Sequence, residues 1–318
     1  MDFVAFLCYN QAVDRHTILP KRLFMEFLGI LQVLLLGLIE GITEWLPVSS
    51  TGHIILFNQF YPNRLSPAFL DMFEYVVQLA AILAVVVFFW KKLFPFALKK
   101  EEIDNTESGE KVLKTKLTAD MGILNLWGKV AVACVPAVGA IVIDKLFDTL
   151  NPLAESTIIA FALIFYGIVF IVIESYFKKD AKVTEIPQLS YKYAFFIGCF
   201  QLLAAIPGTS RSGITIIGAL LLGASRESAT EFTFFLAIPT MVGASAYKLL
   251  KFFMATGSIS GAEIGYLLIG CAVAFAVSLV AIKFLTDFVK KHDFKVFGWY
   301  RIVLGAIVIG ALVIPTLL

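Results

Sequence analysis

Apolar residues form long blocks along this chain, separated by short polar connections. The blocks cover residues 26–44, 54–60, 69–90, 121–147, 154–177, 191–206, 214–223, 229–250, 263–286 and 296–317. Several of them reach the roughly 20 residues that a helix needs to cross the hydrocarbon core of a bilayer. The pattern therefore predicts a helical protein that crosses a membrane many times.

Two pairs of blocks are interrupted by helix-breaking residues. Pro47 separates 26–44 from 54–60, and Pro207 with Gly208 separates 191–206 from 214–223. Broken backbone at membrane depth is tolerated only where it is buried in protein or lines a cavity. Each broken pair is therefore predicted to be a re-entrant hairpin.

Basic residues predict which connections lie inside the cell. They are concentrated in three connections, as Lys91, Lys92, Lys99, Lys100, Lys111, Lys114 and Lys116, then Lys178, Lys179, Lys182 and Lys192, then Lys290, Lys291, Lys295 and Arg301. Cytoplasmic loops of membrane proteins carry such an excess of Lys and Arg. The connections 56–68, 148–155 and 252–262 are poor in both residues, so we expect them outside.

These orientations predict an inverted-topology repeat. Each half, 25–177 and 191–318, contains one hairpin followed by three full spans, and an odd number of crossings turns the second half upside down. Faint symmetry supports this, since 46–52 aligns with 206–212 at one constant offset, Pro47 against Pro207. The alternative is that 26–44 crosses fully, as the basic residues Arg15, Lys21 and Arg22 before it would favour.

Composition agrees with an all-α polytopic membrane protein and limits its partners. The chain is 59% hydrophobic and 16% charged, with a mean hydropathy of +0.86. We expect one integral membrane domain over 25–318 and an N-terminal extension over 1–24. The formal charge of +2 gives no reason to expect nucleic acid. Scattered cysteines, without disulfide or metal spacing, are interpreted as packing residues.

Glu40 and Glu44 are the first candidates for chemistry. Four residues apart, they project from one face of a helix. No Lys or Arg occurs between Arg22 and Arg64, so local ion pairing is not available. Paired carboxylates can hold Mg²⁺ or Ca²⁺, which prefer oxygen ligands. The alternative is that they cap a helix or pair with a cation elsewhere in the bundle.

Hydroxyl groups and an imidazole follow Pro47. Ser49, Ser50 and Thr51 can each satisfy backbone groups at the start of a half-helix. Ser50 and His53 are three residues apart, which places an imidazole beside a hydroxyl on one helix face. That arrangement predicts that His53 activates Ser50 or protonates a leaving group.

Arg211 is the sharpest feature of the second broken segment. It follows Gly208 and Ser210 at a helix start and has Thr215 four residues later on the same face. A guanidinium with free helix amides suits a phosphate. No acidic residue occurs in 186–226, so a bound anion is favoured over a salt bridge.

The stretches EGITEWLPVSSTGH (40–53) and PGTSRSGIT (207–215) resemble the signature regions of the bacterial undecaprenyl-diphosphate phosphatase family, the bacitracin-resistance type. The resemblance extends from about Met25 to the C-terminus. It implies hydrolysis of undecaprenyl diphosphate to undecaprenyl phosphate and inorganic phosphate, which recycles the lipid carrier for peptidoglycan. It also implies a multi-pass protein of the bacterial inner (plasma) membrane, with an active site that opens to the outer face. The family's functional positions fall on Glu40, Glu44, Ser50, His53, Ser210, Arg211 and Thr215.

The expected mechanism combines these groups. Glu40 and Glu44 hold Mg²⁺ or Ca²⁺, while Arg211 binds the terminal phosphoryl group. Binding is completed by Ser49, Gly208, Ser210 and Thr215. Ser50 attacks with His53 as the proton acceptor, and attack by an activated water stays open.

A different class of protein is the main alternative. Inverted repeats with broken helices are also the architecture of transporters, so a polyprenyl-phosphate lipid transporter or flippase is the second reading. A transporter would not need Ser50 beside His53. The expected partners are a polyprenyl diphosphate lipid and membrane lipids, and a homodimer is left open.

Overall fold

A computed structural model describes most of this chain. The described residues are 21–61, 64–104, 111–140, 143, 147, 150–176, 181–256 and 258–317. The first 20 residues of the predicted extension lie outside them.

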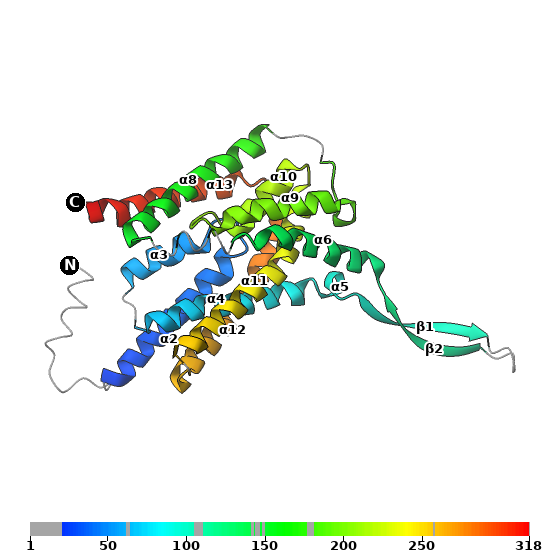
Figure 1. The fold of residues 1–318 in the computed structure, drawn as a ribbon, viewed down its shortest axis with the longest axis horizontal. Coiled ribbons are helices and arrows are strands. Elements are labelled where there is room, and N and C mark those ends of the chain that lie inside the picture. Colours follow the sequence, from blue (N-terminus) through cyan, green and yellow to red (C-terminus); the bar gives the residue numbers. More distant parts are fainter. Residues whose placement is uncertain are drawn as a thin grey trace.

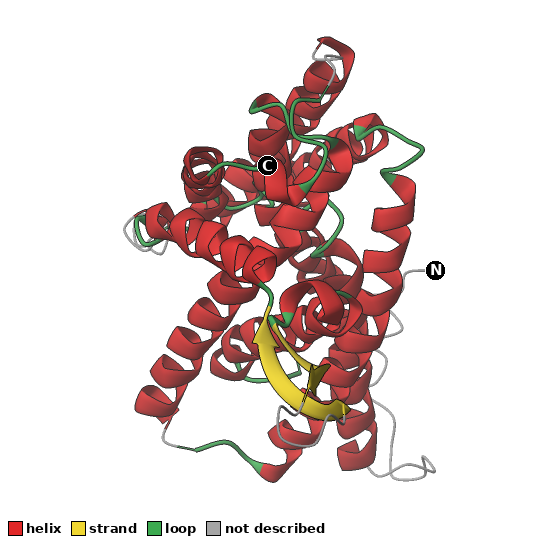
Figure 2. Ribbon diagram, turned by 90° about the vertical axis from the view of Figure 1, so that its right-hand side faces the viewer, coloured by secondary structure: helices red, strands yellow, loops and turns green. Residues whose placement is uncertain are grey.

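Helices make up nearly all of this structure (Figures 1 and 2). They are α2 (Lys21–Thr43), α3 (Ser50–Phe60), α4 (Pro67–Phe88), α5 (Trp90–Leu93), α6 (Met121–Ala137), α8 (Pro152–Tyr176), α9 (Tyr191–Gln201), α10 (Arg211–Leu221), α11 (Arg226–Thr256), α12 (Gly261–Phe288), α13 (Lys295–Val308) and α14 (Ile314–Leu317). Short 3₁₀ turns cover Ile186–Gln188 and Leu202–Ala205, and a π-helical turn covers Ile309–Val313. Among the described residues, six helices are long and apolar enough to cross a membrane. The prediction of a polytopic helical membrane protein is confirmed.

Five of the six predicted full spans coincide with such helices. They correspond to α4, α8, α11, α12 and the continuous segment Lys295–Leu317. The sixth long helix is α2, whose apolar part covers Phe24–Thr43, whereas the predicted span 121–147 contains the shorter helix α6. Pro136 lies in the last turn of α6, where it favours the end of a helix. The length of α2 suits the alternative in which 26–44 crosses fully.

A β-hairpin occupies the basic connection between α5 and α6. Its strands, β1 (Phe96–Asp104) and β2 (Lys111–Ala119), pair antiparallel with Phe96 opposite Ala119. The hairpin extends away from the helices (Figure 1). The hairpin is not predicted from the sequence, where its interspersed lysines give only a charge signal.

Small residues bring the helices into close contact. A Cβ added to Gly298 of α13 would lie 2.7 Å from the backbone oxygen of Gly167 in α8, and one added to Gly37 of α2 would lie 2.7 Å from that of Gly270 in α12. Likewise α9 packs against α6, and α4 packs against α11 and α12. Gly and Ala at such interfaces allow backbones to approach, as is common between membrane helices. These contacts enclose the two broken segments, α2 with α3 and α9 with α10.

The packing of α8 on α13 generates a first prediction. Gly298→Ala should lower the midpoint of thermal unfolding in detergent, because the new methyl group overlaps the backbone of α8. The expected loss in the free energy of unfolding is about 1–3 kcal/mol, as for other overpacked sites. Gly265→Ala in α12 is the matched control, since its Cβ would meet no atom within 4 Å. Equal midpoints for the two variants would contradict the close contact.

Candidate active site

The two broken segments restart their helices in the same way. Ser49 precedes α3 with φ 74° and accepts a hydrogen bond from the Gly52 N–H at 3.4 Å. Ser210 precedes α10 with φ 70° and accepts one from the Gly213 N–H at 3.2 Å. The structure thus pairs Ser49 with Ser210, one residue away from the sequence alignment, which set Ser49 against Thr209. A positive φ outside glycine costs about 1–3 kcal/mol and persists only where its surroundings fix it.

An ion pair joins the two segments. Arg211 Nη2 lies 2.5 Å from Glu44 Oε1, and both side chains are largely buried. Ser212 also donates a hydrogen bond to the backbone oxygen of Glu44 at 3.0 Å. Arg211 has no acidic neighbour in the sequence, which excludes only local partners and led to the prediction of a bound anion. In the structure its partner comes from the other motif, 167 residues away.

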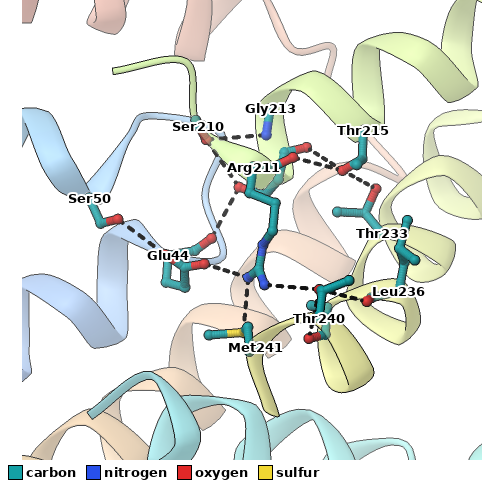
Figure 3. Close-up of polar contacts among 12 residues, drawn as sticks. Glu44, Ser50, Ser210, Arg211, Gly213, Thr215, Thr233, Leu236, Thr240 and Met241 are labelled. Carbon is teal, nitrogen blue, oxygen red and sulfur yellow. Dashed lines mark hydrogen bonds and ion pairs between the residues drawn. The ribbon is translucent and has the colours of Figure 1, made fainter. Parts of the chain in front are cut away.

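Glu44 also binds the candidate nucleophile. Ser50 donates its hydroxyl to Glu44 Oε2 at 3.1 Å, so each carboxylate oxygen receives one donor. Figure 3 shows Ser50 and Arg211 approaching the carboxylate from different helices. Arg211 continues past it to Met241 and to Thr240, whose hydroxyl is 3.5 Å from Nη1. Glu44 is therefore placed to accept the proton of Ser50.

His53 makes other contacts than the predicted one. Its Nδ1 lies 2.7 Å from the Ser49 carbonyl oxygen, which can only accept, so Nδ1 carries a hydrogen. Its Nε2 is 2.6 Å from the Tyr300 hydroxyl, and the two rings are stacked. Among the hydrogen bonds of the described residues, none joins Ser50 to His53. Tyr300 was not predicted, and an isolated tyrosine at the start of an apolar block gives no signal.

Glu40 is a buried carboxylate with one oxygen left unpartnered in the described part of the chain. The Glu44 N–H donates to the Glu40 backbone oxygen at 3.0 Å, so the two carboxylates are one helical turn apart. Glu40 is 3% exposed, and its Oε1 has no hydrogen-bond partner among the described residues. Within the same part of the chain, no cluster of three or more His, Cys, Asp or Glu side chains is found. Two carboxylates with an open oxygen fit Mg²⁺ or Ca²⁺, which often complete their shell with phosphate and water.

The other predicted binding residues differ in their exposure to the site. Thr215 is buried, donates to the Arg211 backbone oxygen at 2.9 Å and accepts from Thr233 at 3.0 Å. Its contact with a phosphate stays a prediction. Gly208 has φ +84°, and an added Cβ would lie 2.7 Å from the Cα of Ile159. Only glycine fits this position.

Arg301 was assigned to a cytoplasmic loop, and this is wrong. The residue is fully buried in α13, where its guanidinium donates to backbone oxygens of both loops. Arg301 lies inside the apolar block 296–317 but follows the loop lysines Lys290, Lys291 and Lys295 closely, so its charge was counted with theirs.

Comparison with known proteins gives one consistent result. Residues 33–307 match the family model described as bacitracin resistance protein BacA. The chain is similar to proteins named undecaprenyl-diphosphatase from three bacteria. These are from Enterococcus faecalis (53% identical over 287 residues, 90% of this chain and 98% of that protein), Lachnoclostridium phytofermentans (52% over 289 residues, 90% and 98%) and Desulfitobacterium hafniense (50% over 288 residues, 90% and 96%).

The loop before Ser210 generates a second prediction, with a control of the same backbone conformation. Gly208→Ala and Gly223→Ala both place a side chain at positive φ, but the nearest atom to the new Cβ is 2.7 Å away at 208 and 3.7 Å away at 223. We expect Gly208→Ala to lower the thermal midpoint more than Gly223→Ala does, because overpacking adds a loss of about 1–3 kcal/mol in the free energy of unfolding to the strain that both variants share. Equal losses would show that the contact with α8 does not constrain the loop.

Proposed function

This chain belongs to the bacitracin resistance protein BacA family, and on that premise we propose how its two loops act together on a lipid diphosphate. Its activity is the hydrolysis of undecaprenyl diphosphate to undecaprenyl phosphate and inorganic phosphate. The chain is thus a membrane-embedded phosphatase, and a role in bacitracin resistance fits the family. The observation that carries the proposal is Glu44, which accepts one hydrogen bond from each broken segment.

Arg211 is proposed to bind the terminal phosphoryl group. Its Nη2 is held by Glu44, while Nη1 has only the long contact to Thr240, at 3.5 Å. Phosphate oxygens can replace that weak contact, and Arg211 is itself the first residue of α10, so the free N–H groups of that first turn belong to the same segment. The start of a helix favours anions through these N–H groups and its dipole. Ser210 holds this first turn in place by capping Gly213.

Ser50 is proposed as the nucleophile and Glu44 as its proton acceptor. The Ser50 oxygen forms a bond to the terminal phosphorus as the bond to the bridging oxygen breaks, and the hydroxyl proton passes to Glu44. Undecaprenyl phosphate leaves, and water then releases inorganic phosphate from the serine. In this scheme Glu44 replaces His53, the acceptor expected from the sequence. His53 instead orients Ser49, because its Nδ1 contacts the backbone carbonyl oxygen of Ser49.

Glu40 and Glu44 are proposed to hold Mg²⁺ or Ca²⁺. When bound, such a cation neutralises charge on the diphosphate, which is a large part of what phosphoryl transfer needs. The open oxygen of Glu40 supports this assignment. Arg211 supplies fixed positive charge from the opposite segment.

The inverted repeat is the architecture that we propose for this site. It is supported by helix pairs that exchange under the repeat, with α2 on α12 matching α9 on α6. The two serine caps, Ser49 and Ser210, support it as well. We further propose that α2 with α3 and α9 with α10 are re-entrant, and that the site opens to the outer face of the inner membrane. Although α2 is long enough to cross alone, a full crossing would break its correspondence with α9 in the repeat. When the buried Arg301 is no longer counted as a loop residue, the three basic connections still carry the excess of Lys and Arg that is typical of cytoplasmic loops.

The transporter alternative has no specific observation in its favour. Broken helices suit both classes, but a transporter gives no reason for a serine hydroxyl to lie on a buried carboxylate. The Ser50 contact with Glu44 therefore favours the phosphatase.

Phosphate release by the purified protein tests the function, with Arg211→Lys as the informative variant. Lysine keeps the positive charge but lacks the two parallel N–H donors of the planar guanidinium. We therefore expect the affinity for undecaprenyl diphosphate to stay within about tenfold of the unmodified protein and the hydrolysis rate to fall by about a hundredfold. Arg226→Lys is the control, because Arg226 pairs with Glu174 outside the site. No phosphate release by the unmodified protein would contradict the function. A parallel loss of affinity and rate would reduce Arg211 to a binding residue.

Glu40→Gln tests the cation assignment. The amide keeps the shape of the side chain but removes its negative charge. We expect the Mg²⁺ or Ca²⁺ concentration for half-maximal phosphate release to rise by about tenfold or more. Most of the activity should return at high concentrations of the cation. Glu231→Gln serves as the control, since Glu231 pairs with Lys92 away from Glu44. An unchanged cation dependence in Glu40→Gln would refute the assignment.

A further inference from the structure

α13 carries an arginine that the proposed reaction does not use. Arg301 is 0% exposed, and all four of its hydrogen bonds go to backbone carbonyl oxygens. Over the part of the chain that the structure describes, no carboxylate forms an ion pair with it. A buried charge without a counter-charge is costly unless its hydrogen bonds are well satisfied. Its position therefore calls for an explanation beyond filling space.

The contacts of Arg301 connect both broken segments. Nη1 donates to the Pro47 oxygen at 3.3 Å, and Nη2 donates to the Gly208 and Thr209 oxygens at 3.0 and 2.9 Å. A longer bond, at 3.4 Å, reaches Ala162 on α8. One guanidinium thus holds the two loops to each other and to the α8 scaffold.

These carbonyls lie just before the two strained serines. Thr209 directly precedes Ser210, and Pro47 precedes Ser49 by two residues. Because the C=O and N–H of a trans peptide point in opposite directions, holding the Thr209 oxygen turns the Ser210 N–H away from Arg301. The guanidinium therefore constrains the peptide planes that lead into both half-helices.

We propose that Arg301 is a positioning residue, which sets the two loops at the separation where Glu44 meets Arg211 and Ser50. The inference rests on the proposed function, because the groups that it positions are those of the phosphatase site. An arginine suits this role, since its planar fork can donate to acceptors on two segments at once, whereas lysine is a single point charge. Arg301 itself touches no reacting atom.

Arg301→Lys and the neutral Arg301→Gln test the proposal in the full-length protein. For each variant we expect kcat for undecaprenyl diphosphate to fall at least tenfold while KM stays within threefold, with helical content retained. Arg226→Lys, which alters the ion pair of the partly exposed Arg226 with Glu174 near the C-terminal end of α8, should leave kcat within twofold.

A second measurement separates positioning from general stability. If Arg301 acts through the placement of Arg211, Arg301→Lys should slow an Arg211→Lys protein by no more than about twofold. Three results would each overturn the proposal. The first is that the two substitutions lower kcat by factors that multiply in the double variant, and the second is that kcat of the single Arg301 variants stays within twofold of the unmodified value. The third is that neither Arg301 variant folds. An unmodified protein that releases no phosphate would instead contradict the function on which the proposal rests.

Discussion

A charge inside a membrane protein must be matched by an opposite charge or by hydrogen bonds, and this constraint organises the centre of the structure. Glu44 and Arg211 satisfy it for each other, although they lie on different halves of the chain. Their pairing requires the end of α2 and the start of α10 to meet. The surrounding helices pack closely through glycines such as Gly167 and Gly298, and so hold these two segments together.

The site therefore lies where two interrupted helix pairs meet, α2 with α3 and α9 with α10. Each half-helix restarts at a serine with positive φ, and each leaves N–H groups available at its first turn. Arg301 fixes the backbone leading into both starts without entering the site. Phosphoryl transfer requires positioning and charge more than new covalent partners from the protein. In the proposed mechanism, that positioning comes from the carboxylate of Glu44, the hydroxyl of Ser50 and the guanidinium of Arg211, which meet in the structure.

The polar residues that the sequence singles out do meet in the structure, but in other pairs than the sequence predicts. Glu44, Ser50 and Arg211 could be predicted because polar groups within long apolar blocks are unusual and costly. Their partners could not, because helix periodicity reports only neighbours on the same helix. Thus the sequence predicts His53, three residues away, as the partner of Ser50, whereas in the structure its partner is Glu44, on the other side of the break between α2 and α3. The same limit explains why the sequence favours a bound anion over a salt bridge for Arg211.

The fold shows a similar division. Apolar blocks and Pro207 indicated the helices and a break, whereas the β1–β2 hairpin and the burial of Arg301 depend on pairing and packing that a block pattern does not contain.

The most direct test of the account is a double-mutant cycle on kcat/KM for undecaprenyl diphosphate, with Glu44→Gln, Arg211→Gln and the double variant. If the two residues act as one unit across the loops, the double variant will be about as slow as the slower single variant. Effects that multiply would show that the two loops work independently, and would contradict the single joined site.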